Sequence, residues 1–143
     1  MHDEFTAEFD RMFADLARRA RSGCFEPNAD VYVDEDRTRI VVHVELAGAD
    51  ADSLRVGVDE RSLYIFGRRV ERADQRAGSI LRKEIEYGEF QKKIRLPFPI
   101  DHDEAHATYR DGILSIRVPI SKAEDFPTQN RTEVRMIVRR IPV

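Results

Sequence analysis

The segment Ala107-Thr108-Tyr109-Arg110-Asp111-Gly112-Ile113-Leu114 carries the strongest hairpin signal in the chain. Asp and Gly tolerate the positive φ that the central residues of a tight hairpin turn require. A two-residue loop at Asp111-Gly112 sorts the flanking residues into two faces. The pairs on one face are all apolar: Tyr109 with Leu114, Ala107 with Ile116, and Ala105 with Val118. The register therefore predicts a hairpin with one buried face and one mostly solvated face.

The composition bounds the class of protein. A chain of 143 residues, 36% charged and 41% hydrophobic, is long enough for one domain with arms. The net charge of -3, with both signs mixed, argues against a general nucleic-acid binder. Cys24 is the single cysteine, so no intramolecular disulfide is possible. No apolar run approaches the roughly 20 residues of a membrane span, and no signal peptide opens the chain. We therefore expect a cytoplasmic protein with no membrane or nucleic-acid partner.

Residues 5–20 have the period of an amphipathic helix. Its apolar stripe consists of Phe5, Phe9, Met12, Phe13 and Leu16. One interpretation packs this stripe on the core of its own domain, and the other makes it an arm that packs between subunits and against other proteins. The breakers Ser22-Gly23 and Pro27-Asn28 separate the helix from the rest of the chain, which favours the arm.

From residue 30 the hydrophobic period changes to two, which is typical of short strands. Apolar alternation recurs over residues 31–33, 40–46, 54–58, 63–67, 89–96 and 105–118. Turn residues separate these runs and no helical pattern interrupts them. Six or seven short strands of this kind predict an all-β sandwich.

Lys92 falls on the apolar face of the strand predicted over residues 89–96. A cation there either reaches water at the sheet edge or pairs with a carboxylate at a subunit contact. The sequence leaves both interpretations open.

Residues 68–88 are the least patterned part of the predicted domain, and Ile80 and Leu81 are their only adjacent aliphatic pair. An unpatterned stretch of this length is usually functional. We predict a loop with a small strand that reaches a second subunit, and the alternative is a disordered surface loop.

Residues 121–131 form a polar extension, after which Met136-Ile137-Val138 and Ile141-Pro142-Val143 turn apolar again. Pro142 fixes its own φ and favours an extended Ile141, so Ile141 and Val143 point the same way. These two side chains are predicted to dock in a groove, and the alternative is a frayed terminus.

Several of these segments together resemble the small heat-shock protein (α-crystallin) family. The matching motifs, in chain order, are Pro27-Asn28-Ala29-Asp30-Val31-Tyr32, Val44-Glu45-Leu46-Ala47-Gly48, Leu63-Tyr64-Ile65-Phe66-Gly67-Arg68-Arg69, Tyr87-Gly88-Glu89-Phe90 with Leu96-Pro97, Ala107 with Gly112-Ile113-Leu114, and Ile141-Pro142-Val143. Motifs in the correct order over nearly the whole chain are far more specific than any single motif. The chain differs from the family pattern at Ala47, where Pro is usual, at Ile113, where Val is usual, and at Lys92, where Arg is common. Lys lacks the planar, bidentate pairing of Arg.

The resemblance implies an immunoglobulin-like β-sandwich over residues 29–120, between an N-terminal arm (1–28) and a C-terminal extension (121–143). It implies dimers in which the long loop exchanges a strand, so that Ile80, Leu81 and Lys92 are the predicted dimer contacts. It also implies larger homo-oligomers in which Ile141 and Val143 of one subunit dock on another. The predicted groove for this anchor is lined by Leu54, Val56, Val58, Ala105, Ala107 and Tyr109.

The predicted function is that of an ATP-independent holdase chaperone. Its partners are itself, unfolding client proteins and ATP-dependent chaperones to which clients are handed over. The Phe-rich arm and a vacated groove supply the apolar surface for clients. The alternative is a binding module, a CS-type co-chaperone sandwich that docks on a larger chaperone, and a monomer in size-exclusion chromatography would support it.

The sequence offers no support for an enzyme, a cofactor or a metal. It contains no glycine-rich phosphate loop and no constellation of nucleophile and base. His102 and His106 lie among acidic residues, but the i,i+4 spacing separates ligands on a strand. Cys24 has no obvious activating base. The arginines of residues 68–82 alternate with carboxylates, which is typical of a solvated loop rather than a phosphate-binding surface.

Overall fold

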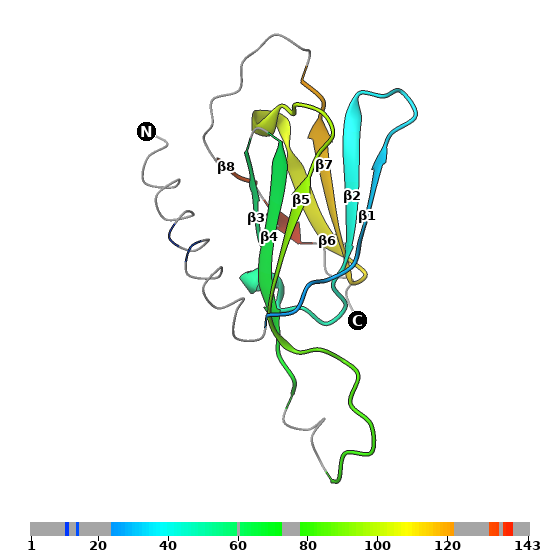
Figure 1. The fold of residues 1–143 in the computed structure, drawn as a ribbon, viewed down its shortest axis with the longest axis vertical. Coiled ribbons are helices and arrows are strands. Elements are labelled where there is room, and N and C mark those ends of the chain that lie inside the picture. Colours follow the sequence, from blue (N-terminus) through cyan, green and yellow to red (C-terminus); the bar gives the residue numbers. More distant parts are fainter. Residues whose placement is uncertain are drawn as a thin grey trace.

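Two sheets of mainly antiparallel strands, packed face to face, make up the body of the chain (Figure 1). The computed structural model describes residues 11, 14, 24–59, 61–72, 78–121, 132–134 and 136–138. The strands are β1 (Ala29–Val33), β2 (Arg39–Glu45), β3 (Arg55–Val58), β4 (Ser62–Arg69), β5 (Gly88–Arg95), β6 (His106–Arg110), β7 (Ile113–Pro119), β8 (Thr132–Glu133) and β9 (Met136–Val138), with 3-10 turns η2 (Ala51–Ser53) and η4 (His102–Glu104). The strand orders are β1-β2-β7-β6-β9 and β5-β4-β3-β8. The all-β sandwich predicted from the alternation is confirmed.

The core lies between the two sheets and follows the period of two. β7 buries alternate side chains, because successive residues of a strand point to opposite faces. β4 is buried on both faces over most of its length, and β1 is mostly exposed. The largest fully buried side chains are Phe90, Ile40, Leu46, Leu63, Ile65, Leu96, Ile100, Leu114, Ile116, Val42 and Val44. They come from β2, β4, β5, β7 and the adjoining turns, so the core holds both sheets together.

The β6–β7 hairpin has the predicted turn and nearly the predicted register. Asp111 and Gly112 take φ values of 54° and 77°, and Tyr109 pairs with Leu114. The turn also joins the end of β2, because the Gly112 carbonyl accepts a hydrogen bond of 2.8 Å from the Leu46 amide. The ladder has this register from Arg110 to His106 and ends there, because Ala105 caps the 3-10 turn η4. The predicted pair of Ala105 with Val118 therefore lies just beyond the ladder.

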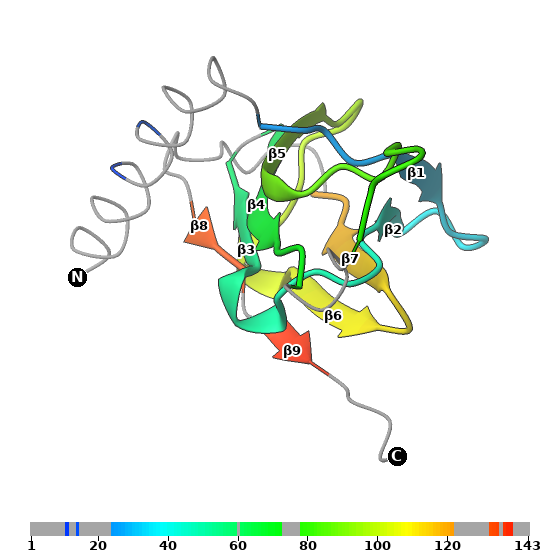
Figure 2. The same ribbon diagram turned by 90° about the horizontal axis from the view of Figure 1, so that it is seen from below.

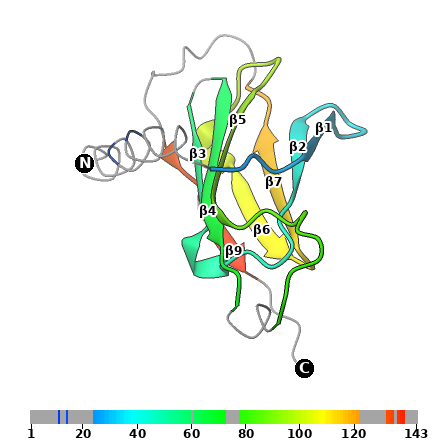
Figure 3. The ribbon, with the colours of Figure 1, turned by 60° about the horizontal axis from the view of Figure 1, so that its bottom comes forward.

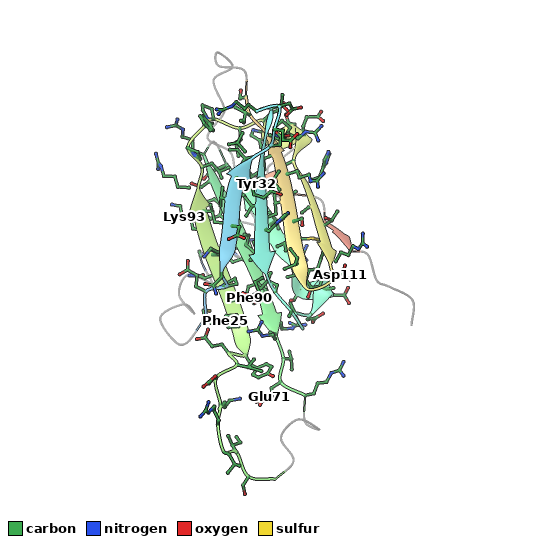
Figure 4. All side chains as sticks on the ribbon, turned by 90° about the vertical axis from the view of Figure 1, so that its right-hand side faces the viewer. Phe25, Tyr32, Glu71, Phe90, Lys93 and Asp111 are labelled. Carbon is green, nitrogen blue, oxygen red and sulfur yellow. The ribbon has the colours of Figure 1, made fainter. Side chains whose placement is uncertain are left out.

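A parallel bridge joins Phe25 to Phe90 at the outer edge of β5. The Phe25 amide donates to the Glu89 carbonyl at 3.0 Å, and the Phe25 carbonyl accepts from the Gln91 amide at 3.1 Å. The two rings lie 5.4 Å apart and can be seen side by side in Figure 4. Phe25 is therefore part of the buried core, although it precedes the first predicted strand.

Two predicted segments fall largely on residues that the structure does not describe. Of the helix predicted over residues 5–20, only Arg11 and Ala14 are described, and both are helical. Ser121 is the one described residue of the polar extension predicted over residues 121–131. The boundaries predicted at residues 28 and 120 stay predictions.

Candidate assembly and client-binding surfaces

The strands predicted to hold the C-terminal anchor lie at the same edge of the sandwich. β3 belongs to the four-stranded sheet and β6 to the five-stranded sheet, and each lies one strand from the end of its sheet. The predicted lining residues Leu54, Val56, Val58, Ala105 and Ala107 are all buried, and Tyr109 is half-buried against the same core. The structure thus brings all six predicted residues together, and we call this region the β3–β6 edge.

Residues 132–134 and 136–138 of the same chain, which together we call the seal, lie along the β3–β6 edge. β8 pairs antiparallel with Gly57 and Val58 of β3, and β9 pairs parallel with residues 107–109 of β6. Figure 2 shows β8 beside β3 at one sheet, and Figures 2 and 3 show β9 beside β6 at the other. The seal therefore pairs with both sheets.

Val134 is the most deeply buried described side chain of the seal, and no sequence pattern singled it out. Its side chain is only 5% exposed and belongs to the core cluster, and Met136 packs partly buried against the same cluster. The Val134 amide donates a hydrogen bond of 2.6 Å to the Val56 carbonyl. The available signal was the apolar alternation of Val134 and Met136, but it spans too few residues to identify a strand.

Tyr109 links the β3–β6 edge to the end of β2. Its hydroxyl donates a hydrogen bond of 2.6 Å to the Leu46 carbonyl. Burial raises the pKa of Tyr109, and this effect outweighs the opposing effects of a backbone hydrogen bond and of the Arg69 charge. The phenol is therefore held neutral, as a hydrogen-bond donor requires.

The loop between β4 and β5 extends away from both sheets (Figure 1). The side chains of Ile80, Leu81 and Ile85 are 65%, 98% and 60% exposed. The small strand predicted here is not found among residues 70–72 and 78–87, the part of the loop that the structure describes. The predicted role of Ile80 and Leu81 as dimer contacts stays a prediction.

Arg69 fastens the base of this loop to the sandwich. Its Nε and Nη2 atoms donate to the Glu86 carbonyl at 2.9 and 2.7 Å, and its Nη1 atom donates to the Ala47 carbonyl at 3.2 Å. The guanidinium carbon lies 4.7 Å from the centre of the Phe25 ring, within the range of a cation–π contact. One planar side chain thus joins both ends of the loop to the core.

Lys92 finds a carboxylate within its own chain. Its Nζ lies 3.7 Å from Oε1 of Glu26, and its side chain is mostly buried whereas that of Glu26 is exposed. The sequence left open whether Lys92 reaches water at the sheet edge or pairs with a carboxylate at a subunit contact. Neither interpretation placed its carboxylate partner in the segment before β1 of the same chain. The predicted role of Lys92 at a dimer contact stays a prediction.

Charged groups near the loop are paired locally. Arg68 contacts Asp50 at 2.9 Å, and Lys83 contacts Glu71 at 2.9 Å.

The two histidines considered as metal ligands lie apart from this loop. His102 lies 3.1 Å from Asp103, whereas His106 is exposed on β6. Among the residues described, no group of three or more His, Cys, Asp or Glu side chains could hold a metal ion. Within the same residues, no helix has the length and apolar character needed to cross a membrane.

The other predicted site residues lie outside the described residues. They are the arm residues Phe5, Phe9, Met12, Phe13 and Leu16 and the anchor residues Ile141 and Val143. Their roles stay predictions.

Comparisons with known proteins agree with this architecture. The model of the Hsp20/alpha crystallin family matches residues 32–135. "Small heat shock protein C4" of Rickettsia felis is 31% identical over 93 residues, which are 65% of this chain and 56% of that protein. The chain therefore spans little more than half the length of that relative.

Two solved structures extend the comparison. The structure of hspA from Xanthomonas axonopodis has a TM-score of 0.61 and 29% identity, covering 70% of this chain and 98% of that chain. The structure of a small heat-shock protein from Xylella fastidiosa, described as revealing a distinct high order structure, has a TM-score of 0.58 and 27% identity. That match covers 82% of this chain and 94% of the other.

Proposed function

Because the chain belongs to the Hsp20/alpha crystallin family, we propose that it is an ATP-independent holdase chaperone. It binds proteins that are unfolding and prevents their aggregation, and it catalyses no reaction. It acts in the cytoplasm as a homo-oligomer assembled from dimers, and it passes its clients to ATP-dependent chaperones.

The exposed aliphatic side chains of the projecting loop carry this proposal. Ile80, Leu81 and Ile85 remain in water in the single chain and contribute little to its core. Burial of such surface is favourable by roughly 25 cal/mol per Å², so the loop gains stability when another polypeptide covers it. A sandwich that is complete without these residues can use them for association.

The N-terminal stripe supplies the second apolar surface in this proposal. Three phenylalanines, one methionine and one leucine at helical spacing offer a large area for contact with unfolded chains. Self-association covers this surface in the resting oligomer, so client binding competes with assembly. Heating weakens the contacts between subunits and makes the surface available when clients begin to unfold.

Light scattering from a heat-labile enzyme tests the proposal. The enzyme is heated without nucleotide, alone or with an equal mass of this chain, and an inert protein of equal mass is the control. We expect this chain to suppress the scattering and the inert protein to leave it unchanged. Equal scattering in both samples would reject the holdase function.

A further inference from the structure

The β3–β6 edge is already occupied by the chain itself. Val134 lies within the core at this edge, and its amide donates a hydrogen bond to the carbonyl of Val56. β9 uses the backbone of residues 107–109 on β6. An extended segment from a second copy would need the same backbone groups, because strand addition depends on main-chain hydrogen bonds. The edge therefore cannot hold the seal and a second strand at the same time.

The seal and the tail share an apolar spacing. In each segment, one apolar residue lies on either side of a single intervening residue: Val134-Arg135-Met136 in the seal and Ile141-Pro142-Val143 in the tail. In an extended chain, side chains two residues apart point to the same side. Either segment can therefore present two apolar side chains to the edge, and the structure has Val134 and Met136 in contact with it.

We propose that the seal is an intramolecular plug, which keeps the β3–β6 edge closed until the tail of a second copy displaces it. This inference rests on the assembly through the tail that is part of the proposed function. The seal is joined to β7 by a short stretch of chain, and such a tether gives effective concentrations in the millimolar range. An edge that is open in one chain out of ten binds an incoming tail about tenfold more weakly than a permanently open edge.

Fluorescence anisotropy with a labelled synthetic peptide, Arg139-Arg140-Ile141-Pro142-Val143, measures access to the edge. The full chain carries Ile141→Gly and Val143→Gly, so that its own tail does not compete with the peptide. We expect Val134→Ser in this background to raise the affinity for the peptide by about tenfold or more, because it weakens the plug. An unchanged or lower affinity would overturn the proposal.

Ile113→Ser is the matched control. Ile113 is an exposed aliphatic residue of β7, outside both the seal and the edge residues. We expect this variant to bind the peptide as weakly as the background chain. An increase equal to that of Val134→Ser would show general loosening of the fold and would overturn the proposal.

A reversible cross-link provides a test that does not weaken the core. Thr108 and Ile137 are directly paired residues of β6 and β9, which places their Cα atoms within the range that a disulfide can span. In the chain with Cys24→Ser, Thr108→Cys and Ile137→Cys, oxidation should abolish peptide binding and reduction should restore it. Peptide binding that is equal in both states would overturn the proposal.

The readouts separate this inference from the proposed function. Peptide binding involves no client, and light scattering involves no peptide. Failure to suppress aggregation together with a closed edge would reject the holdase alone. Suppression together with an edge that is equally open in all variants would reject the plug alone.

Discussion

The Phe90 ring lies directly against the Cα atom of Gly67, with no room for a side chain at that position. A Cβ atom built on Gly67 would meet the Cζ atom of Phe90 closer than real Cβ atoms approach, and Leu54 Cδ2 would lie 3.1 Å away. Phe90 is fully buried and cannot move into solvent.

We therefore expect Gly67→Ala to lower the free energy of unfolding by about 1–3 kcal/mol, measured in urea. A smaller side chain at position 90 should relieve the clash, so Gly67→Ala with Phe90→Leu should lose less than the sum of the single changes. Additive losses would contradict this explanation.

Tyr109→Phe tests the hydrogen bond that joins β6 to the end of β2. We expect a loss of about 0.5–1.5 kcal/mol at neutral pH, because the Leu46 carbonyl loses its donor. Burial raises the pKa of Tyr109 above the usual 10.0, so the stability linked to this residue is present below pH 10. As the pH rises further the unfolded state loses its phenolic proton first, and this stability is lost. Urea unfolding at neutral and alkaline pH should show that the difference in unfolding free energy between the unmodified chain and Tyr109→Phe becomes smaller above pH 10. A difference that grows above pH 10 would contradict the role of the neutral Tyr109 hydroxyl as a hydrogen-bond donor.

Arg69→Lys tests the fastening of the projecting loop. Lys cannot donate to the Glu86 and Ala47 carbonyls in the same planar geometry, so we expect faster amide exchange in residues 78–87 and a stability loss of about 1 kcal/mol. Arg68→Lys is the matched control, because Lys can retain the single contact that Arg68 makes with Asp50. Equal exchange in the two variants would remove the special role of Arg69.

Replacing Ile80 and Leu81 with Ser tests the predicted dimer contacts. Both side chains are exposed in the single chain, so we expect native mass spectrometry to show smaller species while circular dichroism still shows the β-structure. Arg82→Ser changes an exposed neighbour and should leave the mass distribution unchanged. An unaltered distribution in the double variant would remove the loop from the predicted interface.

Replacing Ile141 and Val143 with Gly tests the predicted anchor. The change removes both apolar side chains of the tail, and we expect the assembly to shrink towards dimers in size-exclusion chromatography. Arg139→Gly with Arg140→Gly adds the same number of glycines without removing apolar surface, so it should preserve the elution volume. Shrinkage of both variants to the same extent would attribute the effect to backbone freedom rather than to docking.

The parts of the fold that depend on local pattern could be predicted from the sequence. Alternation over residues 40–46 predicts a buried strand because the period is set within the strand itself, and Asp111-Gly112 predicts the turn because few other residues accept its φ values. The positions of Phe25 and Val134 could not be predicted in this way. Each adds to the edge of a sheet that exists only after distant strands have paired, and each belongs to a segment too short to show a period.

The candidate site also has a part that could be predicted from the sequence and a part that could not. The six residues of the β3–β6 edge could be assigned from the family motifs, since strands in a fixed order bring them together. The partner of Lys92 could not, because Glu26 reaches it only through the Phe25 bridge to β5. The apolar segment Met136-Ile137-Val138 is visible in the sequence, but the pairing of the seal could not be predicted. Its strands of two and three residues are too short to show a period, and they are defined only by their pairing with β3 and β6.

The order of synthesis gives the seal a further consequence. A ribosome completes β3 and β6 before it reaches β8, which begins at Thr132, whereas β6 ends at Arg110. At translation rates of roughly 5–20 residues per second, a nascent chain spends about a second or more with β3 and β6 synthesised and β8 not yet synthesised. In the competition proposed above, the edge of such a nascent chain has no seal to exclude an incoming tail.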